Sequence, residues 1–126
     1  VFDVSHMGEV FVSGENSLDF LQSITSNDVS KLTVGKVQYT CLPNADGGIV
    51  DDFLLYKIEE NKYLLVVNAS NMEKDLKWIN DHNYFNCTID NQSENYSLLA
   101  VQGPHTIELL QQLTDVDLSE IKYYNF

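Results

Sequence analysis

Two adjacent acids, Asp51 and Asp52, lie inside a hydrophobic stretch, and their type and position suit them to chemistry. The stretch reads NADGGIVDDFLLY over residues 44–56, so the pair follows a double glycine and continues into an apolar segment. A carboxylate is rarely fully buried unless it is paired, and a positioned carboxylate can accept hydrogen bonds or act as a general base. Side chains alternate across a strand, so the two acids point to opposite faces and cannot form a dyad with each other.

This alternation assigns different surroundings to the two acids. The face of Asp52 also carries the side chains of Val50, Leu54 and Tyr56. Asp51 is expected to face solvent or a turn, and Tyr39 joins the Asp52 face if the hairpin register brings it across. The alternative is a strand-end acid that accepts hydrogen bonds from backbone amides of the turn at residues 47–48.

Other polar residues indicate a binding surface more than a catalytic triad. Asp3, Ser5 and His6 lie together in DVSHMGE, but a triad needs long-range geometry that one short loop does not establish. Asn68 ends an apolar strand at the start of a helix, where a capping or turn role is the simplest interpretation. An apolar face with one acid, one tyrosine and one asparagine suits a flat polar heterocycle, and these residues do not identify which.

The elements that position these residues follow from the hydrophobic periodicity. Alternation predicts strands over residues 10–13, 37–42, 49–58, 63–67, 88–90, 98–102 and 121–126. A helical period predicts helices over residues 16–24, 72–82 and 104–113, with inward positions at Met72, Leu76, Ile79, Ile107, Leu110 and Leu113. Asn16 is a possible cap of the first helix, and Ser70 with Glu73 fits a capping box for the second. We therefore expect an α+β fold, a mainly antiparallel sheet with helices packed on one face, as in a ferredoxin-like or Greek-key unit.

Composition excludes several classes of function. The formal net charge is −12 and the chain contains no arginine, which disfavours nucleic acid and anionic membrane surfaces as partners. Cys41 and Cys87 stand far apart without clustered histidines, so we expect neither a disulfide framework nor a metal site. No apolar run approaches the ~20 residues of a membrane span.

Five segments together resemble the aminomethyltransferase, or T-protein, family of the glycine cleavage system. In chain order they are FDVSHMGEVFVSG, FLQSITSNDVSKL, NADGGIVDDFLLYK, LLVVNASNMEKDLKWI and LLAVQGP. The resemblance runs end to end but covers only part of a family member. Residues 1–126 are therefore expected to be part of the tetrahydrofolate-binding domain of a longer chain, truncated at both ends.

The resemblance implies a tetrahydrofolate-dependent enzyme. T-proteins take the aminomethyl group from the lipoyl arm of the H-protein, release ammonia and leave methylenetetrahydrofolate. The family's catalytic acid, the second after the double glycine, matches Asp52, whereas Asp51 has no assigned contact and its replacement by asparagine is expected to be mild. Folate-binding positions of the family match Met7, Phe11, Tyr39, Asp52, Val66 and Asn68. Phe11 stands where an aliphatic residue is common.

Two alternatives stay open beside this interpretation. One is a related folate-binding protein without aminomethyl transfer, of the iron–sulfur assembly type, and the other is a non-catalytic interaction module. Without an arginine, these residues offer no bidentate partner for the glutamate carboxylates of folate, so the piece alone is expected to be inactive. The resemblance implies a cytoplasmic protein in a bacterium, or a mitochondrial one in a eukaryote.

Overall fold

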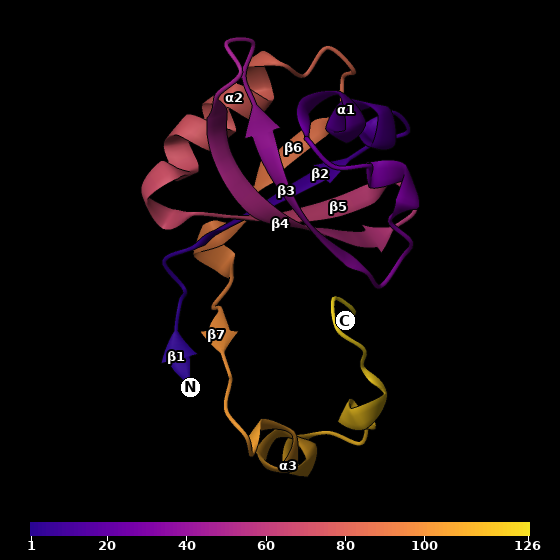
Figure 1. Cartoon of the computed structure of the whole chain (residues 1–126), viewed down its shortest axis with the longest axis vertical. Coiled ribbons are helices and arrows are strands. Elements are labelled where there is room, and N and C mark those ends of the chain that lie inside the picture. The colour runs from indigo at the N-terminus through magenta and orange to yellow at the C-terminus, as the bar shows by residue number, and fades with distance from the viewer.

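The computed structural model describes all of residues 1–126 and confirms the α+β class. The strands are β1 (Phe2–Asp3), β2 (Gly8–Ser13), β3 (Val37–Pro43), β4 (Ile49–Glu59), β5 (Lys62–Val67), β6 (Thr88–Asn91) and β7 (Leu99–Ala100) (Figure 1). The α-helices are α1 (Ser17–Ile24), α2 (Met72–Asp81) and α3 (Thr106–Leu110). Short 3-10 turns cover Val29–Lys31, Ala69–Asn71, Ser93–Asn95, Gln111–Leu113 and Leu118–Glu120. None of the helices combines the length and apolar character needed to cross a bilayer.

The larger sheet has five strands in the order β3-β4-β5-β2-β6, and every pairing in it is antiparallel. Strands β3, β4 and β5 follow one another as a meander, and β2 pairs with the far edge of β5. The connection from β2 to β3 runs through α1, which gives the expected Greek-key arrangement. A separate two-stranded pair joins β1 to β7.

The hydrophobic core lies between one face of this sheet and the helices α1 and α2. Alternation places every second residue of β2, β4 and β5 on that face, as the buried side chains of Val10, Val12, Phe53, Leu55, Tyr63, Leu65 and Val67 show. The helices add Phe20, Leu21, Ile24 and Ile79 to the same cluster. Leu76 and Met72 are partly buried against it, so the stripe predicted for α2 is confirmed. The opposite face of the sheet is therefore free of these helices.

Gly8 at the start of β2 lies against Met72 of α2 and Val67 of β5. A Cβ atom at this position would come within 2.8 Å of both the Met72 sulfur and a methyl group of Val67. We expect Gly8→Ala to lower the free energy of unfolding by about 1–3 kcal/mol because the neighbours must shift to admit the methyl group. Urea unfolding would measure the loss, and adding Val67→Ala should recover part of it. Strictly additive effects of the two substitutions would contradict this explanation.

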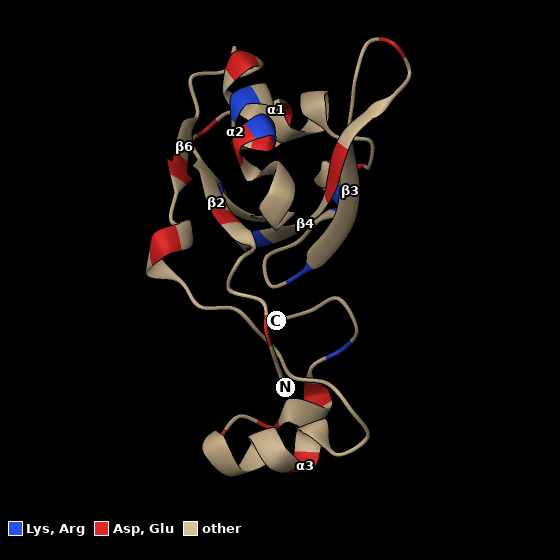
Figure 2. Ribbon diagram, turned by 90° about the vertical axis from the view of Figure 1, so that its left-hand side faces the viewer, with Lys and Arg blue, Asp and Glu red and all other residues tan.

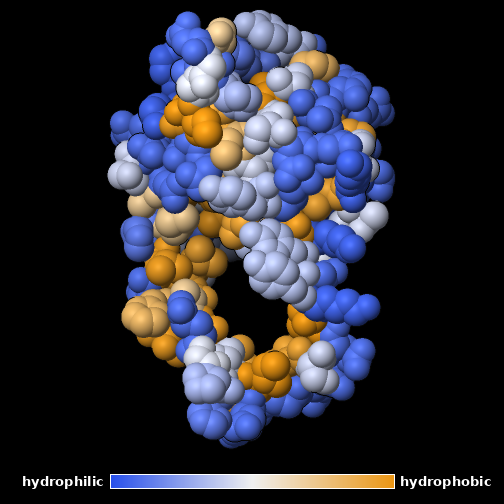
Figure 3. Space-filling view, viewed as in Figure 1, coloured by the Kyte–Doolittle hydropathy of each residue, from blue (hydrophilic) through white to orange (hydrophobic).

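The segment after β7, residues 104–126, departs from the prediction. Helix α3 is only five residues long and continues as a 3-10 turn, and its intended inward residues Ile107 and Leu113 are 54% and 80% exposed. The strand predicted over 121–126 is wrong, since this segment makes only one isolated bridge, between Lys36 and Asn125. Figures 1 and 3 show β1, β7, α3 and the C-terminal segment as an open loop with apolar atoms facing its centre. Residues 104–113 do have a helical period of apolar side chains. The structure contains no other element against which this short helix buries them.

Two predicted helix caps also differ. Helix α2 follows the 3-10 turn Ala69–Asn71, and no side chain caps its first turn, so the Ser70–Glu73 capping box is wrong. Asn16 does occupy the N-cap position of α1, but its side-chain amide donates to the Phe85 carbonyl instead, at 3.2 Å. Acidic residues outnumber basic ones by 19 to 7, and in the view of Figure 2 two basic segments lie next to each other on α2.

Candidate functional site

A cavity of about 270 Å³ opens on the face of the sheet opposite the two packed helices. It is lined by Met7, Tyr39, Asp52, Phe53, Leu54, Val66 and Asn68. These residues come from the turn before β2, from β3 and β4, and from the end of β5. Five of the six residues singled out as folate-binding therefore lie around one hollow, and so does the acid singled out as catalytic.

The strand register explains this gathering. Tyr39 pairs with Leu54, and Leu54 pairs with Val66, so three side chains form a row across β3, β4 and β5 on one face. Asp52 lies two residues before Leu54 on that face, and Asn68 directly follows β5. The expectation that Tyr39 shares the face of Asp52 is confirmed.

The Asn68 side chain joins the two acids of β4. Its amide nitrogen donates to Asp51 Oδ1 at 3.1 Å and to the main-chain carbonyl of Asp52 at 2.9 Å. Both hydrogens of the amide are thus used, which leaves the Asn68 carbonyl oxygen as a free acceptor. The Asn68 main chain accepts from the Asn71 amide at 3.0 Å, so the predicted turn role is confirmed as well.

Tyr39 and Asp52 interact at the mouth of the cavity. The hydrogen bond with the Asp52 carboxylate raises the pKa of the Tyr39 hydroxyl, with burial and charge repulsion from the same carboxylate adding to it. The Tyr39 side chain is half exposed and can reach an incoming molecule. The cavity therefore presents a carboxylate, a phenol and an amide oxygen beside the apolar side chains of Met7 and Val66.

Asp51 does not face solvent, as the sequence predicted, but is 8% exposed beneath α2. Its partner there is Asp75, which is 1% exposed. Burial pushes the pKa of Asp51 upward, but hydrogen bonds from Asp75, the Asp52 amide, Asn68 and Asn71 bring that pKa below its ordinary value. The alternative role in the turn is wrong for both acids, because the Asn44 side chain accepts from the Gly48 amide, at 2.7 Å.

Sequence reasoning missed Asp75, although a signal existed. Asp75 lies three residues after Met72 and four before Ile79, which places it on the buried face of α2. Burial, followed by the hydrogen bond and the charge of Asp51, raises the pKa of Asp75 to about 7. A carboxyl group beside another carboxyl group in this setting carries a proton at neutral pH for part of the molecules.

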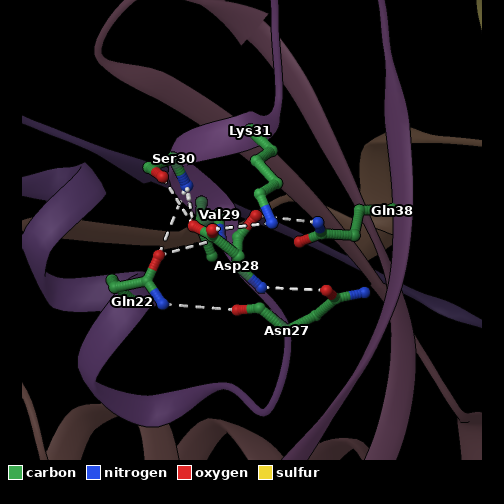
Figure 4. Close-up of polar contacts among 7 residues, drawn as sticks. All are labelled: Gln22, Asn27, Asp28, Val29, Ser30, Lys31 and Gln38. Atoms are coloured by element: carbon green, nitrogen blue, oxygen red, sulfur yellow. Dashed lines mark hydrogen bonds and ion pairs between the residues drawn. The ribbon is translucent and has the colours of Figure 1, made fainter.

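The loop over residues 26–31 fixes the position of β3, and hence of Tyr39. The Asn27 side chain donates to the Tyr39 carbonyl at 3.0 Å, and the Gln38 side chain donates to the Asp28 carbonyl at 2.9 Å. Gln22 of α1 accepts from the Val29 amide at 2.8 Å and donates to the Asn27 carbonyl at 3.4 Å. Figure 4 shows these side chains converging on the loop between α1 and β3.

Phe11 is the one predicted folate contact that lies apart from the cavity. It lines a separate hollow of about 310 Å³ with Lys62, Asp90 and Tyr96, toward β6. Phe11 pairs with Leu64, and Val66 pairs with Glu9, so Phe11 lies one step further along the same face. Phe11 therefore lies on the same face of the sheet as the cavity but lines a different hollow.

A larger hollow of about 380 Å³ adjoins the Asp52 cavity at Leu54. Its other lining residues are Val37, Tyr56, Tyr124, Asn125 and Phe126. It contains no carboxylate, so its chemistry is limited to apolar contact and hydrogen bonding. Asp3 and His6 are exposed, and the structure does not assemble them with Ser5 into a triad.

Three comparisons with known proteins, by family model, by sequence and by structure, point to the same family. The family model described as the GCVT N-terminal domain matches residues 1–126. Proteins named aminomethyltransferase from Bacteroides fragilis and Bacillus subtilis are 60% and 56% identical over 126 residues, which is 100% of this chain and 35% of each relative. The crystal structure of glycine cleavage system aminomethyltransferase T from Bartonella henselae matches with a TM-score of 0.82 and 28% identity, over 98% of this chain and 34% of that one. The chain thus spans about a third of the length of the curated relatives it matches.

Proposed function

This chain belongs to the GCVT N-terminal domain family, and we propose that it forms part of the tetrahydrofolate-binding domain of a longer aminomethyltransferase. In this proposal the enzyme is the T-protein of the glycine cleavage system. Its cosubstrate is tetrahydrofolate, and its partner is an H-protein that carries the aminomethyl group on a lipoyl arm. Similarity to bacterial aminomethyltransferases supports the proposal, and with it a cytoplasmic location in a bacterium.

The observation that carries the proposal is the convergence of Asp52, Tyr39 and Asn68 on one hollow. A pterin is a flat ring system with N–H donors along its edge, and the acceptors of this cavity are a carboxylate and an amide oxygen. Met7, Leu54 and Val66 offer apolar contact for the faces of the ring. The residues present therefore fit one part of tetrahydrofolate.

Asp52 has the central role in this assignment. Tetrahydrofolate supplies the nitrogen atoms that receive the one-carbon unit and so carries the transfer chemistry. A carboxylate on an apolar face orients those nitrogens by accepting their hydrogens and stabilises positive charge that develops beside it. The Tyr39 hydroxyl keeps the carboxylate in place, and Asn68 binds a second donor of the ring edge.

These residues supply one wall of a binding site and no clamp for the glutamate tail. No arginine exists in the chain, and no lysine lines the cavity. Bidentate partners for the tail must therefore come from another part of the protein. A ligand on one wall alone keeps its other face in water, and few contacts offset the cost of association.

The test compares the full-length protein with its residues 1–126. Both are mixed with tetrahydrofolate and aminomethyl-loaded H-protein, and ammonia release is measured. We expect folate-dependent release from the full-length protein. The short piece, once circular dichroism has shown it to be folded, should give none above the uncatalysed rate.

The controls separate the remaining functions. Folate binding by the full-length protein without ammonia release would identify a folate-binding protein of another kind. Absence of both binding and release would favour an interaction module. Full turnover by the short piece would contradict the division of the site between this chain and the rest of the protein.

A further inference from the structure

We propose that Asp75 is a positioning residue of the pocket, acting through Asp51 to orient the Asn68 side chain with its carbonyl oxygen toward the ligand. The inference rests on the proposed function and deepens it, because it assigns a role to two acids outside the cavity. The chain of contacts runs from α2 through the core face of β4 to the end of β5.

The first step is the orientation of the Asn68 amide. Its nitrogen lies 3.1 Å from Asp51 Oδ1 and 2.9 Å from the Asp52 carbonyl oxygen, and both neighbours are acceptors. Turning the amide over would place its oxygen against these two acceptors and would leave both without a donor. The Asn68 amide nitrogen therefore points toward β4, and its carbonyl oxygen points toward the cavity.

The second step is the state of Asp51. An ionised Asp51 is a stronger acceptor for Asn68 than a protonated one. Lys74 of α2 forms no ion pair with it, because the Lys74 ammonium donates to the Val50 carbonyl at 2.6 Å and lies exposed. A donor from elsewhere must therefore stabilise the buried charge of Asp51.

The third step is the partner that does so. Asp75 lies against Asp51, and both Asp75 oxygens and Asp51 Oδ2 are buried without a hydrogen-bond partner unless a proton lies between the two carboxyl groups. Two carboxylates with both charges present repel each other, whereas one shared proton converts the contact into a hydrogen bond. A protonated Asp75 thus completes the set of donors to Asp51.

The electrostatic surroundings are consistent with this arrangement. Burial, the neighbouring Asp51 and the charge of Asp52 raise the pKa of Asp75, Lys74 lowers it, and together these effects bring it to about 7. These are the charged groups that face Asp75 from α2 and β4. Loss of the proton at alkaline pH would place two charges side by side and weaken the support of Asn68.

The test measures Asn68 directly and needs no ligand. In full-length protein with 15N-labelled asparagine, the side-chain amide resonance of Asn68 is identified by its loss in Asn68→Ser. We expect this resonance to shift with a midpoint near pH 7 in the unmodified protein and to stay constant in Asp75→Asn. An asparagine at 75 donates an N–H to Asp51 at every pH. The matched control is Asp81→Asn on the exposed side of α2, which should titrate as the unmodified protein does.

A second measurement connects the amide to the ligand. Tetrahydrofolate affinity of the unmodified protein should fall by about tenfold as Asp75 loses its proton, whereas Asp75→Asn should keep its affinity across the same range. A constant Asn68 resonance in the unmodified protein, or one that titrates equally in Asp75→Asn, would overturn the inference. Failure of the unmodified protein to bind tetrahydrofolate at any pH would instead overturn the proposed function, and the resonance would still decide the role of Asp75.

Discussion

Replacement of Asp52 by asparagine should remove most aminomethyl transfer from the full-length protein and leave its fold intact. The substitution removes a charge and almost no volume at a half-buried position in the cavity wall. An amide orients the ligand less strongly and does not stabilise positive charge, so we expect kcat/KM to fall by about 10²–10⁴-fold. Steady-state ammonia release at saturating H-protein measures the effect.

The matched control for this substitution is Asp46→Asn. Asp46 is exposed in the turn of the same hairpin and is not among the residues that line the cavity, so its replacement should change kcat/KM little. Asp51→Asn should have an intermediate effect, since its amide still accepts from Asn68 and donates to Asp75. Equal losses from Asp52→Asn and Asp51→Asn, or a larger loss from Asp51→Asn, would show that the two faces of β4 were assigned wrongly.

The stability of the protein should fall as the pH rises from about 4 to about 7. The folded state raises the pKa of Asp75 from 3.8 to about 7, so in this interval the folded chain keeps a proton that the unfolded chain has lost. The stabilisation is complete below the unfolded pKa and is lost as pH passes the folded one. The limiting slope for one proton is about 1.4 kcal/mol per pH unit.

Urea unfolding of the full-length protein and of Asp75→Asn at several pH values measures this contribution. Asparagine carries no charge at any pH, so the free energy of unfolding of the variant should increase relative to that of the unmodified protein as the pH rises. Above pH 7 the variant should be more stable by about 1–3 kcal/mol. Glu9, whose pKa burial also raises, contributes a slope of the same sign in both proteins and cancels in the comparison. A difference between the two that does not change with pH would contradict the assignment to Asp75.

The sequence predicted which strand face carries Asp52 better than it predicted the surroundings of Asp51. Alternation along β4 assigned Asp52 to its face without reference to any other segment. The place of Tyr39 depended on the hairpin register, which the sequence left open and which the pairing of Tyr39 with Leu54 resolves. Met7 and Asn68 came from the family resemblance, because residues at strand ends carry no periodicity of their own.

The errors have a common physical origin. Asp51 was expected at the surface because an isolated charge avoids the core, and its partner Asp75 lies 24 positions away on a helix. No local pattern joins these two residues, although each lay on a predictable face. The exposed residues of α3 show the opposite error, because apolar side chains expected in the core lie at the surface. The helical period identifies the apolar face of a helix but not the element that covers this face.

The loop over residues 26–31 has a consequence for how the pocket can diversify. Two of its hydrogen bonds to β3 reach main-chain atoms: the Tyr39 carbonyl accepts from the Asn27 side chain at 3.0 Å, and the Cys41 amide donates to the Ser26 hydroxyl at 3.1 Å. The backbone of the strand is therefore held at the carbonyl of residue 39 and the amide of residue 41, whichever side chain position 39 carries. Natural variation or directed evolution can exchange the residue at this position to change ligand preference, and the backbone that presents it stays in place.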